Sequence, residues 1–149
     1  MRVLAAVLRV LAAVLLCAMF FAWGGMHGID TPRAVADTSS TAATEVPPDS
    51  SWSDFEDDPR IVDSHPVTFQ TWSRTPSGDA VLVYFTTGTP QCHGVHATVR
   101  ETDDAIEIAL RGGTPPDAVG KMCTMIAVRG SLLVPLENPL AERRVLSVV

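Results

Sequence analysis

The sequence predicts an all-β domain, a small antiparallel β-sandwich or partly open barrel of about seven strands, preceded by an N-terminal hydrophobic helix and a disordered linker. Two observations predict it. Beyond Ile61, apolar and polar residues alternate with the period of a strand. Clusters of Gly, Pro and Asp separate these stretches at short intervals. The chain of 149 residues therefore holds one domain of about 90 residues, expected over 61–149.

Residues 1–36 have the pattern of an export signal. Arg2 precedes an apolar segment, Val3 to Trp23, and no acidic residue occurs before Asp30. A basic N-terminus holds that end of the segment in the cytoplasm, so everything after the segment would lie outside. We therefore expect an exported protein with an extracytoplasmic domain.

The sequence leaves open whether this segment stays in the chain. A helix over 3–23 would be about 31 Å long and could cross the hydrocarbon layer of about 30 Å. It would also place Arg9 inside that layer, at a cost of up to about 3.5 kcal/mol. The alternative is cleavage after Ala34-Val35-Ala36, a signal-peptidase site that lies rather far beyond the apolar run. The protein is then either anchored to the membrane by its N-terminal helix or secreted after cleavage near Ala36.

Residues 37–60 predict a disordered acidic linker rich in Ser, Thr and Pro. They include seven acidic side chains and one basic side chain. Such a segment buries too little apolar surface to offset the roughly 1 to 2 kcal/mol of backbone entropy that each ordered residue costs. Trp52 and Phe55 are exceptions that could dock on the domain or on a partner, and we expect weak docking or none.

Alternation of apolar and polar residues places the strands of the domain. The expected strands are 67–72, 80–85, 95–101, 105–111, 125–128, 131–134 and 145–148. Ala80 to Phe85 is apolar at every position, as expected of a central strand that is covered on both faces.

Two hairpins are expected from the turn residues between these strands. Thr102-Asp103-Asp104 would connect 95–101 to 105–111, with both apolar rows on one face. Arg129-Gly130 would form a two-residue turn before 131–134, in which the glycine supplies a positive φ.

Cys92 and Cys123 are the cysteines outside the hydrophobic segment, which contains Cys17. Because an exported domain meets oxidising conditions, we expect a disulfide between them. Closing a loop of about 32 residues contributes roughly 3.5 to 4 kcal/mol in the chain-entropy model. Reduction is then expected to unfold most of the domain.

The histidines offer a second interpretation of the same region. His93 and His96 lie close to Cys92, and Cys123 would complete a Cys2His2 zinc site. Two features oppose it: alternation directs the two histidines to opposite faces of a strand, and thiolates are hard to keep reduced outside the cell. We expect no metal, with the ring of His93 packed over the disulfide, and keep metal handling by His93 and His96, with His65 and the acidic linker, as an alternative.

A search for catalytic constellations is negative. Asp63-Ser64-His65 holds the residue types of a hydrolytic triad, but neighbouring side chains on an extended chain point apart. Asp103 and Asp104 form a carboxylate pair at a solvated hairpin tip, where nothing would raise one pKa for general acid catalysis. The loop Gly112 to Gly120 has ordinary turn chemistry rather than that of a phosphate loop. We expect no enzyme and no cofactor.

Charge excludes nucleic acid as a partner. From Asp37 onward the chain carries 16 acidic and 8 basic side chains, a net charge of −8. A nucleic-acid surface needs clustered Lys and Arg, whereas the basic residues here are isolated apart from Arg143 and Arg144.

Several short motifs follow one another in the last part of the chain: Cys92-His93-Gly94, Val99-Arg100-Glu101-Thr102, Gly113-Thr114-Pro115-Pro116-Asp117-Ala118, Cys123 before Ile126-Ala127-Val128, and Pro139-Leu140 before Arg143. Together they resemble a group of small exported or lipid-anchored proteins of actinobacteria. The resemblance implies an extracytoplasmic β domain with Cys92 paired to Cys123 and carries no catalytic role. This chain departs from the group where it lacks a lipid-attachment cysteine and where His93 replaces an aromatic residue.

These observations lead to one expected function and two alternatives. The expected function is a non-enzymatic binding or structural module of the cell envelope, held outside the membrane on the acidic linker. The alternatives are an exported metal-handling protein using His93 and His96, and an inhibitor or accessory of an exported hydrolase that acts through an exposed loop such as Gly112 to Gly120. The ligand and the oligomeric state are left open.

Overall fold

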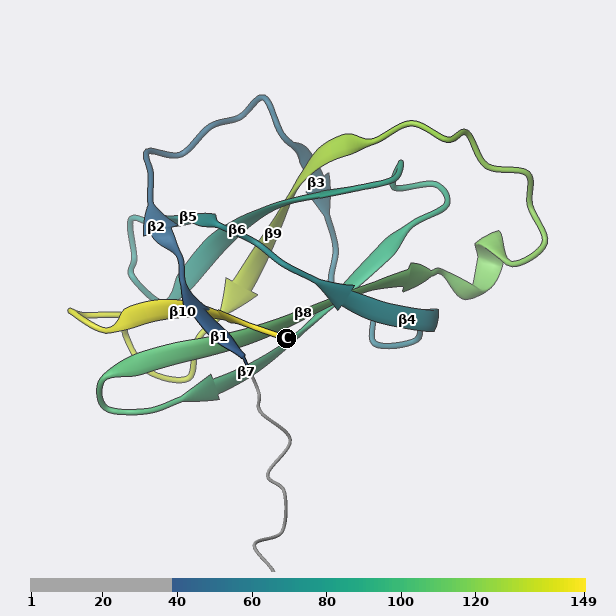
Figure 1. The fold of residues 1–149 in the computed structure, drawn as a ribbon. Helices are drawn as coiled ribbons and strands as arrows, with labels where there is room; N and C mark the ends of the chain where they lie inside the picture. Colours follow the sequence, from purple (N-terminus) through teal and green to yellow (C-terminus); the bar gives the residue numbers. More distant parts are fainter. Residues whose placement is uncertain (1–38) are drawn as a thin grey trace, which may run out of the picture. The chain divides into compact units, whose positions relative to one another are not determined.

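The structure, a computed structural model, describes residues 39–149, and this part of the chain is all-β (Figure 1). The hydrophobic segment 3–23 and the cleavage site at Ala36 lie outside the described residues. Within 39–149, no helix has the length and apolar character needed to cross a membrane. The expected fold class is confirmed at the level of an all-β domain built from two sheets.

Ten strands of the described part form two five-stranded sheets. The first sheet contains β1 (Ser40–Ala42), β4 (Val62–Val67), β7 (Gly94–Glu101), β8 (Ala105–Thr114) and β10 (Arg144–Val148), in the order β1-β10-β8-β4 with β7 also paired to β8. The second contains β2 (Thr44–Glu45), β3 (Ser53–Phe55), β5 (Thr71–Arg74), β6 (Ala80–Thr87) and β9 (Val128–Pro135), in the order β2-β5-β6-β9-β3. A short 3-10 helix, η1 (Pro116–Ala118), follows β8.

Both sheets contribute side chains to one hydrophobic core. The alternating row of β8 is buried as its sequence pattern predicts, with Ile106, Ile108 and Leu110 at most 1 % exposed. From the second sheet, Val81 and Val83 of β6 join the same core. The expected central position of 80–85 is confirmed, because β6 lies between β5 and β9. In the view of Figure 1, strands β5, β6 and β9 of the second sheet lie above β7, β8 and β10 of the first, and both sheets supply residues of this core.

The hairpin of β7 and β8 is also confirmed. Val95 pairs with Gly112 and Val99 with Ile108, which places the apolar rows of both strands on one face. The turn is closed by Thr102, whose backbone N–H donates to the carbonyl of Ala105 at 2.9 Å.

The second expected hairpin is wrong. Residues 128–135 form one continuous strand, β9, and Gly130 lies inside it, paired with Phe85 of β6. A Cβ at Gly130 would lie 2.7 Å from the Phe55 ring and 2.8 Å from the Phe85 ring. This glycine is therefore required by the close approach of two aromatic rings, not by a turn.

The expected strand 67–72 is two strands in the structure. The chain leaves the first sheet at the end of β4 and enters the second with β5, so residues 68–70 cross between the sheets. Phe69 lies in this crossing and is 2 % exposed. Because Phe69 is buried, the alternation of apolar residues continues through 68–70, although these residues belong to neither strand.

The prediction of a disordered linker over 37–60 is wrong for residues 39–60. Three short strands lie there, and Phe55 of β3 is 8 % exposed and belongs to the core. The N–H of Ala43 donates to Val145 of the first sheet at 3.0 Å, and the N–H of Val46 donates to Trp72 of the second at 2.8 Å. These residues are ordered because the edges of both sheets supply their backbone partners, so the composition of the segment does not decide its state.

Both sheets are mixed instead of antiparallel, and the same segment supplies the parallel strands of the second sheet. β2 pairs in parallel with β5, and β3 pairs in parallel with β9. β10 also runs parallel to β8. The short strands β1, β2 and β3 also raise the strand number above the seven expected.

Candidate functional site

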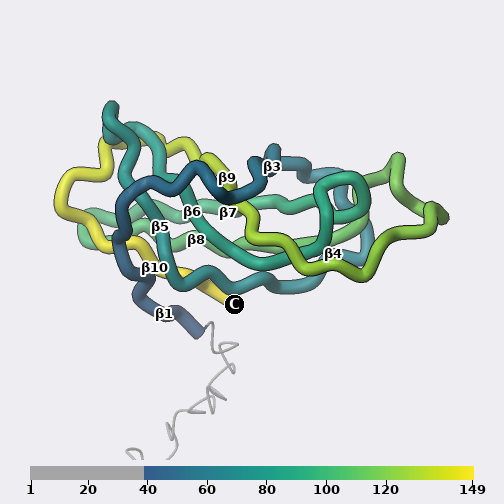
Figure 2. The backbone as a smooth tube through the Cα atoms, turned by 90° about the horizontal axis from the view of Figure 1, so that it is seen from above, coloured from purple at the N-terminus to yellow at the C-terminus, as the bar shows by residue number. Residues whose placement is uncertain are grey.

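The loop between η1 and β9, residues 119–127, presents apolar side chains to solvent. Every residue of this stretch is exposed, and Met122 and Met125 are fully so. Ile126 is 58 % and Val119 60 % exposed. Figures 1 and 2 both show the stretch arching away from the two sheets. We call residues 119–127 the apolar loop.

Most of the backbone of the apolar loop is irregular and unpaired. Residues 121–127 contain no helix, strand or turn. Within the part of the chain that the structure describes, no backbone group from Met122 to Ala127 makes a hydrogen bond to another backbone group. Its N–H and C=O groups are therefore free to pair with another molecule.

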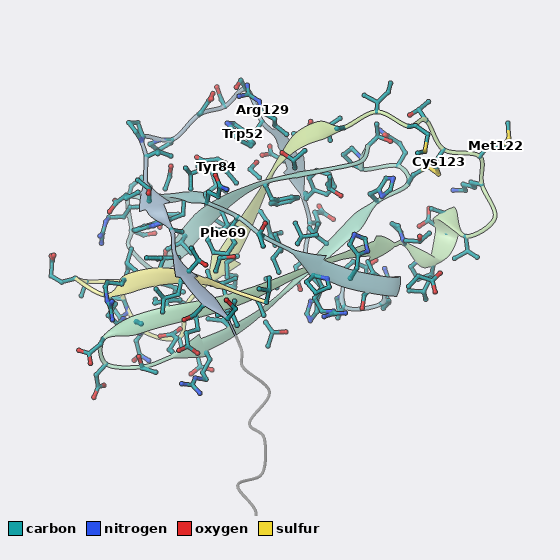
Figure 3. The ribbon with its side chains drawn as sticks, viewed as in Figure 1. Trp52, Phe69, Tyr84, Met122, Cys123 and Arg129 are labelled. Atoms are coloured by element: carbon teal, nitrogen blue, oxygen red, sulfur yellow. A yellow bond between two sulfur atoms is a disulfide. The ribbon has the colours of Figure 1, made fainter. Side chains whose placement is uncertain are left out.

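One covalent bond fixes the middle of the apolar loop to the domain. Cys123 is joined to Cys92 with a Cα–Cα distance of 6.0 Å, which confirms the expected disulfide. Cys92 is 8 % exposed and lies in the loop that precedes β7, whereas Cys123 is exposed. Figure 3 shows Cys123 beside this bond, with the side chain of Met122 directed away from the domain. The disulfide thus connects an exposed loop to a buried anchor.

The exposed loop was expected at Gly112 to Gly120 and begins later than that. Gly112 and Gly113 are buried in β8. A Cβ at Gly113 would lie 2.6 Å from the backbone oxygen of Val62, so the glycine is required where β4 passes β8. The turn-like composition of 112–114 reflects this close strand approach.

The histidines do not converge on a metal site. The His93 ring lies against Gly88, and its expected packing over the disulfide stays a prediction. Nδ1 of His96 lies 3.0 Å from the Asp57 carboxylate. Within 39–149, no three His, Cys, Asp or Glu side chains are grouped to hold a metal ion. The two cysteine sulfurs bond to each other and are not available as thiolate ligands.

The residues of the triad pattern have structural contacts instead. Ser64 Oγ accepts a hydrogen bond from Nε of Arg111 at 3.1 Å, and the Ser64 carbonyl accepts another from the same guanidinium at 2.8 Å. Asp63 adopts a positive φ of 53° where the register of β4 shifts. Among the described residues, no hydrogen bond joins Ser64 to His65, so the structure does not assemble these residues into a triad.

A groove of about 520 Å³ lies beside the crossing segment 68–70. Trp52 borders it, with its ring 4.9 Å from the Tyr84 ring and 4.7 Å from the Arg129 guanidinium (Figure 3). Nε1 of Trp52 donates to Asp49 at 3.0 Å. Docking of Trp52 on the domain, one of the outcomes expected for it, is therefore what the structure shows. The buried rings of Phe69 and Tyr84 are occupied in packing, so the groove itself is lined mainly by polar and backbone groups.

A second hollow, of about 530 Å³, is lined by the acidic stretch 54–58 together with Arg60 and His93. Three of its four carboxylates, those of Asp54, Asp57 and Asp58, accept hydrogen bonds. Asp57 accepts from the N–H of Ala97 at 2.7 Å, and hydrogen bonds from Arg60 hold the pKa of Asp58 below its usual value. Asp54 and Asp57 fasten this stretch to β9 and β7, and their carboxylates are engaged in that role.

No model of a protein family, no curated protein and no solved structure matches this chain. The resemblance to the actinobacterial group stays a prediction. The function is therefore argued from the surface itself.

Proposed function

We propose that the protein is a non-enzymatic binding module of the cell envelope, located outside the cytoplasm, and that the apolar loop is its contact surface. The observation that carries the proposal is the full exposure of Met122 and Met125 on a loop that a disulfide holds in place. Export rests on the N-terminal pattern, and the disulfide is consistent with an oxidising compartment.

The physical argument is one of preorganisation. Exposed apolar side chains gain free energy when a partner removes them from water, by about 1.5 to 3 kcal/mol for a fully buried Met. A flexible loop would lose much of that gain on ordering, whereas the Cys92–Cys123 bond has already restricted this loop. Methionine also adapts its shape to irregular partner surfaces.

The module is proposed to belong to the actinobacterial group that it resembles. It is either anchored to the membrane by its N-terminal helix or secreted after cleavage near Ala36. The metal-handling alternative gains no support from His93 and His96, which have separate contacts.

Site-specific photocrosslinking tests the contact surface. A photoreactive residue at Met122 should give one discrete adduct in the native host, whereas the same residue at Leu133, exposed on β9, should not. With the purified partner, Met122→Ser and Met125→Ser should each weaken binding roughly 10- to 100-fold, and Leu133→Ser should leave it unchanged. Equal adducts from both positions, or an unchanged Kd in both loop variants, would contradict the proposal.

A further inference from the structure

We propose that the apolar loop occupies the active-site cleft of an exported endopeptidase that cleaves after large apolar residues, with Met125 as the side chain that enters the specificity pocket. The inference rests on the proposed function and names the partner of the same surface. It makes the protein a peptidase inhibitor.

The first argument is the state of the backbone. Endopeptidases bind their substrates as extended chains, through main-chain hydrogen bonds of the kind that adds a strand to a sheet. Residues 121–127 form no helix, strand, turn or bend, and the backbone groups from Met122 to Ala127 make no backbone hydrogen bonds within the described chain. A peptidase cleft could therefore supply the backbone partners that these groups lack.

The second argument is the position of the disulfide. Cys123 precedes Met125 by two residues, and β9 begins at Val128, three residues after it. β9 is paired on both sides, with β6 and β3. Met125 is therefore a fully exposed side chain on a short stretch whose two ends are fixed.

Fixed ends distinguish an inhibitor from a substrate. Hydrolysis would break the Met125–Ile126 peptide bond and add water, leaving a carboxylate on Met125 and an amine on Ile126. The disulfide on one side and the pairing of β9 on the other would keep these new ends together. The cleft then stays occupied, and the net cleavage is slow.

Two other occupants fit the loop less well. A membrane surface would favour aromatic and basic residues, whereas the apolar loop holds no aromatic residue and a single basic one, Lys121. The net charge of −8 from Asp37 onward would also oppose an anionic lipid surface. A second copy of this chain would have to cover the apolar loop with a matching apolar surface, whereas the other large apolar side chains that the described residues expose, those of Val62, Leu133 and Val149, are scattered over β4, β9 and the C-terminus.

Inhibition assays with the oxidised full chain test the inference. We expect inhibition of chymotrypsin and subtilisin, which have apolar specificity pockets, and none of trypsin, whose pocket carries an aspartate. Met125→Lys should transfer inhibition to trypsin, and Met125→Gly should weaken inhibition of chymotrypsin roughly 10- to 100-fold. Met122→Lys should not confer trypsin inhibition, and Leu133→Lys should leave the inhibition of chymotrypsin unchanged.

Three results would overturn the inference. They are the absence of inhibition of both apolar-pocket enzymes, rapid cleavage of the loop without inhibition, and a Met125→Lys variant that does not inhibit trypsin. Binding to neutral lipid vesicles or dimer formation that the Met125→Gly variant abolishes would also overturn it. If crosslinking at Met122 still identifies a partner that is not a peptidase, the proposed binding function stands and the peptidase assignment fails.

Discussion

At the residue scale, Gly130 shows how a single missing methyl group shapes the core. A Cβ there would lie within 2.9 Å of three ring atoms of Phe55 and Phe85, whose ring centroids are 5.3 Å apart. We expect Gly130→Ala to destabilise the domain by about 1 to 3 kcal/mol through overpacking, as measured by urea unfolding. In a Phe55→Leu background the same change should cost less, because one of the rings is gone. Equal costs in both backgrounds would contradict this account.

Glu101 and Arg143 form a largely buried ion pair that organises the segment before β10. Their side chains are 10 % and 11 % exposed, with Oε2 of Glu101 2.8 Å from the Arg143 guanidinium. Partial burial raises the pKa of Glu101, but the hydrogen bonds from Arg143 and from the N–H groups of Glu137 and Asn138 outweigh it and lower that pKa below its ordinary value of 4.5. Both residues occur in the motifs that carry the resemblance, and the structure gives them a structural role.

The lowered pKa of Glu101 makes stability depend on pH in a defined direction. The folded state favours the carboxylate, so its contribution is present above pH 4.5 and is lost as pH falls through the folded pKa. We expect Glu101→Gln to cost about 1 to 3 kcal/mol at pH 7 and to flatten the loss of stability below pH 4.5, in urea titrations at several pH values. Glu107→Gln, which removes a more exposed pair with Arg100, is the control and should cost less than about 1 kcal/mol. Equal costs would contradict the role of burial.

At the scale of elements, strand length separates β6, β7 and β8, which the sequence predicted, from β2 and β3, which it missed. β6, β7 and β8 each have eight or more residues, enough for an alternating or continuous apolar pattern to stand out. β2 has two residues and β3 has three, which is too short for any period. Their pairing is imposed by the edges of sheets that form elsewhere in the sequence, so local composition predicts disorder for a segment that the tertiary structure orders.

The segment over 39–58 is therefore expected to be part of the folding unit. Phe55 belongs to the core, and the Trp72 indole donates to the carbonyl of Ala43 at 3.3 Å. A chain that begins at residue 37 should give a dispersed amide NMR spectrum, and one that begins at residue 61 should not. Phe55→Ala in the longer chain should cost about 3 to 5 kcal/mol, whereas Glu56→Ala, at an exposed position, should have little effect. A folded chain starting at residue 61 would restore the linker interpretation.

At the scale of the whole molecule, the sequence predicted the disulfide but not the surface that it serves. Two cysteines in an exported domain are enough to predict a bond. The exposure of Met122 and Met125 has no sequence signal, because the same apolar pattern also fits a buried strand, and 125–128 was predicted as one. Only the structure identifies the apolar loop, because neither β8 nor β9 includes its residues.

This position of the disulfide changes the expected effect of reduction. The chain-entropy model gives roughly 3.5 to 4 kcal/mol, on the assumption that the native state gains no freedom when the bond is cut. Here Cys123 lies in an exposed loop, so the native state does gain freedom and the loss of stability should be smaller. We expect the reduced protein to stay folded with a lower Tm. Limited proteolysis should cut within 119–127, whereas the strands β6, β7, β8 and β9 themselves should resist cleavage. Loss of amide protection throughout β6 and β8 on reduction would show instead that the bond holds the whole domain together.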